Sequence, residues 1–180
     1  MKSDILYAAK DYFTTRPIKK HISKFFIGGI PAIITWIVLE FIPDNKEEVL
    51  LDKIFSNFIN VQISAIAILI SFSIAIITII VSADNANIQK IKETSSTECK
   101  ELKRTGEKLS LFQVLLSNIT YNVFVEAVYL IVLIFCIFLQ MFFSYFIIKI
   151  LIAICVFFII HIFHVLLETV GQMYLTFWRN

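Results

Sequence analysis

The segment Leu111–Phe143, LFQVLLSNITYNVFVEAVYLIVLIFCIFLQMFF, is followed by Ser144-Tyr145 and then by Phe146–Phe177, FIIKILIAICVFFIIHIFHVLLETVGQMYLTF. Each apolar stretch has roughly 30 residues, about 45 Å as a helix, which exceeds a hydrocarbon core of about 30 Å. The short polar break between them predicts the turn of a helical hairpin. We therefore expect two membrane-spanning helices that tilt or project beyond the bilayer.

Two further apolar stretches precede this hairpin, from about Phe25 to Ile42 and from about Phe58 to Ser82. Each is close to the roughly 20 residues that cross a bilayer as a helix. Of the 180 residues, 58% are hydrophobic and 18 are Phe, which is too apolar for a soluble domain of this size. The sequence predicts an all-α integral membrane protein with four transmembrane helices in residues 25–177, after an N-terminal segment of residues 1–24.

Lys and Arg residues are concentrated on one side of the predicted spans. Of the 16, only Lys46, Lys53 and Lys149 lie on the other side. The positive-inside rule therefore predicts that both termini and the loop 83–110 lie in the cytoplasm. The second helix is expected to continue into the cytoplasm to about Thr94, and the third and fourth helices are expected to project on the same side.

The N-terminal segment carries an apolar face formed by Ile5, Leu6, Ala9, Tyr12 and Phe13 and ends at Pro17. Such a face is typical of an interfacial helix that lies on the inner leaflet. The alternative is a plug or gate beneath a pore.

Small and polar residues share one sector of about 80° along the second predicted helix, at 100° per residue. They are Asn57, Asn60, Ser64, Ala67, Ser71, Ala75, Thr78 and Ser82. Small residues spaced by four allow close helix packing, which we favour for a single protomer. A water-lined channel wall has the same pattern, and in an oligomer one stripe can serve both purposes.

The third predicted helix carries a more polar stripe, formed by Asn118, Asn122, Glu126, Tyr129, Cys136 and Gln140. These side chains must face protein or water, because ionisable groups in hydrocarbon are costly. If several copies surround an axis, we expect this stripe to face water in a cation pathway and the second-helix stripe to pack between subunits.

The fourth predicted helix carries His161, His164, Glu168 and Gln172 on one side. Counted from the hairpin turn, Glu126 lies at the depth of His161 to His164, which predicts hydrogen-bonded pairing across the hairpin. In a gated pore, Glu126 would be paired in the closed state and exposed in the open state. We expect no metal ion here, since this spacing of histidine and carboxylate is common in helices.

The sequence lacks a phosphate-binding glycine loop, a Gly-x-Ser-x-Gly motif and a His-Glu-x-x-His motif. We therefore expect neither an enzyme nor a bound cofactor. The loop 83–110 is nearly balanced in charge, so contact with solvent and anionic lipid is the simpler interpretation. A nucleotide-type ligand is the alternative, and the basic residues that would contact it are Lys100, Lys103, Arg104 and Lys108.

Four features of this chain are the four-span layout, the second helix ending in Val81-Ser82-Ala83-Asp84-Asn85, the basic loop and the polar hairpin. With these features the chain resembles the small four-helix membrane components of bacterial antiphage defence systems, of the Hailong effector channel and Kiwa membrane subunit type. The resemblance implies a protein of the bacterial inner membrane that alters membrane permeability under the control of a cytosolic partner or ligand. A single bundle leaves no aqueous lumen, so conduction requires a homo-oligomer, with a tetramer as the first expectation. The alternatives are a membrane anchor or sensor that recruits a cytosolic partner, and a small carrier or enzyme subunit.

Overall fold

The computed structural model describes residues 12–14, 16–41, 47–83, 86–96, 108–142 and 144–178, and these residues are predominantly helical. Four of the helices are long and apolar enough to cross a membrane, which confirms the predicted membrane protein with transmembrane helices. They are α2 (Ile18–Glu40), α3 (Glu47–Ser82), α5 (Leu111–Leu139) and α6 (Tyr145–Trp178). Two shorter helical elements accompany them, α4 (Ala86–Glu93) and the 3-10 turn η2 (Gln140–Phe142).

The predicted hairpin is present, with α5 and α6 joined through η2. The start of α5 is fixed by a capping box, in which Ser110 Oγ accepts from Gln113 N (3.2 Å) and Gln113 Oε1 accepts from Ser110 N (2.9 Å). At the turn of the hairpin, the backbone N–H of Ile148 donates to the carbonyl of Ser144, and α6 begins at Tyr145, within the polar break.

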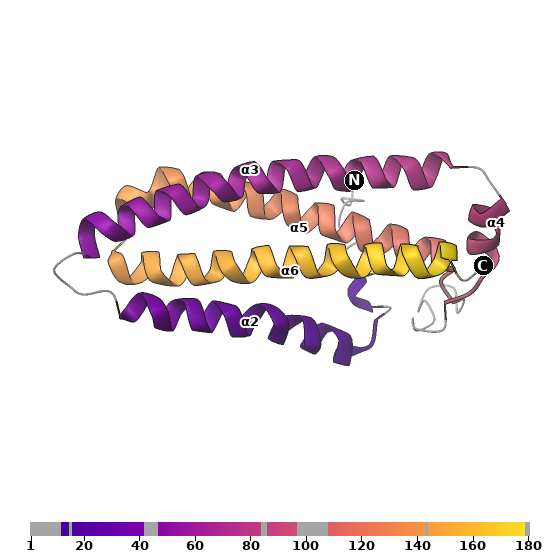
Figure 1. Ribbon diagram of the computed structural model, residues 1–180, viewed down its shortest axis with the longest axis horizontal. Helices are drawn as coiled ribbons and strands as arrows, with labels where there is room; N and C mark the ends of the chain where they lie inside the picture. The colour runs from indigo at the N-terminus through magenta and orange to yellow at the C-terminus, as the bar shows by residue number, and fades with distance from the viewer. Residues whose placement is uncertain are drawn as a thin grey trace.

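The second span differs from its predicted form at both ends. It does not continue to Thr94, because α3 ends at Ser82 and α4 is a separate helix that turns away from it (Figure 1). Ile88 and Ile91 of α4 are buried, and α4 packs against α5. At its other end α3 begins at Glu47, well before Phe58, and its 36 residues correspond to about 54 Å of helix.

The helices are arranged in the order α2, α6, α5 and α3, with α6 between α2 and the other pair (Figure 1). One apolar core joins α3, α5 and α6 and includes Leu39 of α2. Its most buried members are Leu51, Phe55, Ile59, Ile66, Leu133, Ile148 and Ile162. We call the end of the bundle near α4 the α4 end and the opposite end, where η2 lies, the hairpin end. Two polar contacts close the hairpin end, Lys149–Glu40 (3.5 Å) and Gln140 Nε2 to Asp52 Oδ1 (3.3 Å).

Helices α2 and α6 approach closely at Gly28. A Cβ atom at this position would lie 3.0 Å from the Phe157 ring and 3.2 Å from its carbonyl oxygen, whereas the neighbouring Gly29 has open space around it. We expect Gly28→Ala to lower the free energy of unfolding by about 1–2 kcal/mol through overpacking. Gly29→Ala is the matched control and should be neutral or stabilising by up to about 1 kcal/mol, because alanine favours the helix. Equal unfolding curves for the two variants would show that the α2–α6 contact is looser than described.

Candidate functional site: polar side chains of the bundle

Glu126 lies at the centre of the bundle and is fully buried, at 0% exposure. Its Oε1 accepts hydrogen bonds from Asn122 Nδ2 (2.7 Å), on the preceding turn of α5, and from Ser73 Oγ (3.3 Å), on α3. The predicted pairing of Glu126 with His161 or His164 is therefore wrong. The carboxylate ties α5 to α3 and not to α6.

The two histidines of α6 have other surroundings. His161 Nε2 lies 3.2 Å from the hydroxyl of Tyr121, and His164 is half-buried without a hydrogen bond to another described residue. The prediction matched residues by depth, counted from the hairpin turn. Depth does not determine the direction in which a side chain leaves its helix, and Glu126 leaves α5 on the side that faces α3.

Glu126 is one member of a buried row on α5 with Asn118 and Asn122, which we call the α5 row. Asn118 Nδ2 donates to Gln172 Oε1 on α6 (2.7 Å). Each member also has one buried oxygen that accepts no hydrogen bond from the described residues, namely Asn118 Oδ1, Asn122 Oδ1 and Glu126 Oε2. The α5 row faces protein, so its expected contact with pore water is not found in this protomer. Gln140, the last residue of the predicted stripe, lies apart from the row at the hairpin end.

Tyr129 extends the polar contacts of α5 toward the hairpin end. Its ring is buried and stacks on Phe158 of α6. Its hydroxyl donates to Gln62 Oε1 on α3 and lies 3.1 Å from the carbonyl oxygen of Cys155 on α6. One phenol thus links three helices in the interior, where an unpaired polar group would be costly.

A second polar cluster, which the sequence did not indicate, occupies the α4 end. Lys24 of α2 is buried and forms an ion pair with Glu168 of α6. Lys24 Nζ also donates to the hydroxyl of Tyr12 (2.8 Å), whose ring stacks on Tyr121 at 3.7 Å between centroids. The guanidinium carbon of Arg16 lies over the Tyr12 ring, 3.8 Å from the ring centroid. The sequence signal that could have indicated this cluster is Lys24, a cation at the edge of the first apolar stretch.

Tyr12 comes from the N-terminal segment that was expected to lie on the membrane surface. It is 1% exposed and inserted against α5, whereas the adjacent Phe13 is 54% exposed. The inserted ring does not fit a purely interfacial helix. Ile5, Leu6 and Ala9 lie outside the described residues.

The small and polar stripe of α3, which we call the α3 stripe, faces away from the protomer. Ser64, Ser71, Thr78 and Ser82 are all exposed, and the buried face of α3 on its other side carries Gln62, Ile66, Ser73 and Ile80. The hydroxyls of Ser64, Ser71 and Thr78 donate to the carbonyls of Asn60, Ala67 and Ile74, at 3.0–3.1 Å. The favoured interpretation of the stripe as packing within one protomer is therefore wrong.

Of the basic residues predicted to contact a ligand, Lys108 is exposed, and Lys100, Lys103 and Arg104 lie outside the described residues. The base of their loop is held by an antiparallel bridge between Ser95 and Ser110, with Ser96 N donating to Leu109 O at 2.8 Å. Within the described part of the chain, no three His, Cys, Asp or Glu side chains are grouped to hold a metal ion. Comparison of the chain with protein-family models, curated proteins and solved structures gives no match.

Proposed function

We propose that the protein is an oligomeric, gated ion channel in which the α3 stripe of each copy faces a shared axis. The observation that carries the proposal is the outward exposure of this stripe within a membrane span. The amides of Asn57 and Asn60 are exposed on the same face, and such groups are poorly accommodated by lipid. Copies arranged around an axis would remove the stripe from lipid and surround a path lined by amides, hydroxyls and small side chains.

The roles of the two stripes are thereby exchanged relative to the sequence-based expectation. The α3 stripe lines the axis, and the α5 row lies behind α3 in the protomer. Ser73 of α3 donates a hydrogen bond to Glu126 of α5. A displacement of α3 during gating would break this bond and expose the Glu126 carboxylate, which α3 covers, to the pore. We place a cation pathway and its gate at this contact between α3 and α5.

The proposed setting is the bacterial inner membrane during antiphage defence, with both termini and the loop 83–110 in the cytoplasm. The resemblance in layout supports the setting, and the positive-inside bias supports the orientation. A cytosolic protein or a nucleotide-type ligand at the basic loop would act as the trigger. Labelling with a membrane-impermeant thiol reagent from the periplasm is expected to reach Asn45→Cys but not the native Cys99. Labelling of Cys99 from the periplasm would reverse the orientation.

Conduction through the α3 stripe is testable by modifying one position of the pore wall. In a Cys99→Ser background, we expect a cationic thiol reagent to reduce the single-channel current of Ser71→Cys close to zero, because Ser71 faces the axis. Phe72→Cys is the matched control, since Phe72 is 51% exposed but points about 100° away, toward lipid. Its current should not change.

The mass of the detergent-extracted complex provides an independent measurement, and a monomer would contradict the channel. A purified oligomer that passes no ions at any voltage would favour the second candidate, a membrane anchor that recruits a cytosolic partner. The feature that favours this candidate is α4, which covers one end of the bundle and exposes Lys90 and Lys92 beside the loop.

A further inference from the structure

A mostly apolar cavity of about 190 Å³ lies at the α4 end, between the N-terminal segment, α2, α5 and α6. Aromatic rings form most of its described lining, namely those of Tyr12, Phe13, Phe25, Tyr121 and Phe157. Two of them, Tyr12 and Tyr121, stack on each other with 3.7 Å between their centroids. Such walls suit a flat and largely apolar ring, because aromatic rings pack favourably against one another.

The described lining contains one charged side chain, that of Lys24, and its charge is already compensated. The ammonium group forms the ion pair with Glu168 and donates to the hydroxyl of Tyr12. An anionic ligand would therefore find no free cation among the described lining residues, and burying an unpaired charge is costly. The ligand that fits this cavity is electrically neutral.

Two imidazoles supply the polar atoms that remain available in the lining. His21 Nε2 and His161 Nδ1 are buried and form no hydrogen bond with the described residues. An imidazole nitrogen donates or accepts according to its tautomer, so each can bond to a carbonyl or a hydroxyl oxygen of a ligand. Because buried polar atoms are normally paired, a ring that carries two oxygens fits the cavity better than a pure hydrocarbon.

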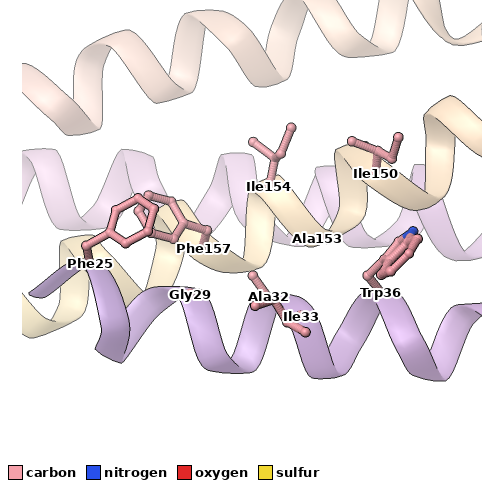
Figure 2. Close-up of a pocket in the computed structure, with 9 residues that line it drawn as sticks. All are labelled: Phe25, Gly29, Ala32, Ile33, Trp36, Ile150, Ala153, Ile154 and Phe157. Carbon is pink, nitrogen blue, oxygen red and sulfur yellow. The ribbon is translucent and has the colours of Figure 1, made fainter.

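An apolar groove of about 460 Å³ continues from the cavity between α2 and α6. Phe25 and Phe157 line both spaces, with their ring centroids 5.4 Å apart. Figure 2 shows these two rings at one end of the groove and Trp36 at the other, with the small residues Gly29 and Ala32 between them. From Phe25 to Trp36 the groove follows α2 for about 16 Å, at 1.5 Å per residue. Its described lining exposes only apolar atoms, which suits a hydrocarbon tail.

We propose that cavity and groove together bind one isoprenoid quinone, a neutral membrane-soluble molecule with a flat ring, two ring oxygens and a long apolar tail. The ring lies in the cavity, with its oxygens bonded to His21 and His161, and the tail lies in the groove. Both spaces lie along candidate membrane spans, and Ile33 and Ile154 of the groove are exposed on the outside of the bundle, so the ligand enters from the bilayer. A phospholipid would bring a charged phosphate to a cavity that offers it no free cation. A helix of a second copy would cover the groove but would leave the two imidazoles unpaired.

Equilibrium dialysis of the purified full chain in detergent against radiolabelled decylubiquinone tests the proposal. We expect saturable binding of one quinone per chain. His21→Leu and His161→Leu should each weaken this binding about fivefold, the effect of one lost hydrogen bond. His164→Leu is the matched control, since His164 lies one turn further along α6 and does not belong to the described lining. Its affinity should not change.

A second pair of variants tests the groove. Ala32→Phe fills it and should reduce the affinity for decylubiquinone to that for the same quinone ring without a tail. Ile34→Phe places a ring about 160° away on α2, at a site that is 55% exposed, and should have no effect.

Two results would overturn the proposal. The first is the absence of saturable binding, which would leave the imidazoles to water. The second is equal displacement of the quinone by decylbenzene, which has a ring and the same tail but lacks the ring oxygens. Neither result depends on whether the protein conducts ions.

Discussion

Replacing Glu168 with alanine is expected to lower the free energy of unfolding by about 3 kcal/mol, the largest loss we anticipate from a single substitution. The side chain of Lys24 is 6% exposed and that of Glu168 is 21% exposed. Removing the carboxylate takes away the described ion-pair partner of a buried ammonium group, and losing one member of a buried pair costs more than the pair itself contributes. Equilibrium unfolding in mixed micelles, followed by circular dichroism, measures the change.

Two controls distinguish this mechanism from a general effect of losing a charge. Glu40→Ala removes the acidic partner of the other ion pair, Lys149–Glu40, but Glu40 is 44% exposed, so we expect a loss below about 1 kcal/mol. The double variant Lys24→Met/Glu168→Met should recover most of the stability, because a buried pair is often replaced by apolar side chains at little cost. A double variant as unstable as Glu168→Ala would show that the cluster needs the ammonium group itself, through its bond to Tyr12.

The spans and the hairpin were predictable because they depend on local sequence. Long apolar stretches require helices in a membrane, and Ser144 with Tyr145 marks the break between α5 and α6. The start of α5 also follows from a local signal, the Ser110–Gln113 capping box. The end of α3 at Ser82 differs from the predicted continuation, although Asp84-Asn85 follows shortly after it. Such residues compete with the helix for backbone hydrogen bonds and so favour a helix end at this position.

The partners of the polar residues were not predictable in the same way, because they depend on how the helices rotate about their axes. Sequence periodicity grouped Asn118, Asn122 and Glu126 correctly on one face of α5, but it did not indicate which helix covers that face. Ser73 was overlooked because it lies outside the α3 stripe, on the buried side of α3. The pairing of Lys24 with Glu168 depends in the same way on the rotation of α2 and α6, which periodicity within one helix does not determine.

Glu126→Ala is expected to destabilise the protein by about 2 kcal/mol, since Asn122 Nδ2 and Ser73 Oγ both lose their acceptor and a cavity forms beside them. Glu126→Gln should be nearly neutral, within about 0.6 kcal/mol, the average value of a hydrogen bond between membrane helices. Its amide keeps an acceptor and adds donors beside Asn122 Oδ1, which accepts no hydrogen bond from the described residues.

Glu126→Met fills the volume without supplying an acceptor, so its loss in unfolding free energy should lie between those of the other two variants. This order of Ala, Met and Gln separates the cavity from the hydrogen bonds. If all three variants are instead destabilised equally, the negative charge that each of them removes must be required in the folded protein. An ionised carboxylate at this depth needs a compensating cation. The proposed gate would then hold a bound cation at the α5 row, and its stability should increase with the concentration of that ion.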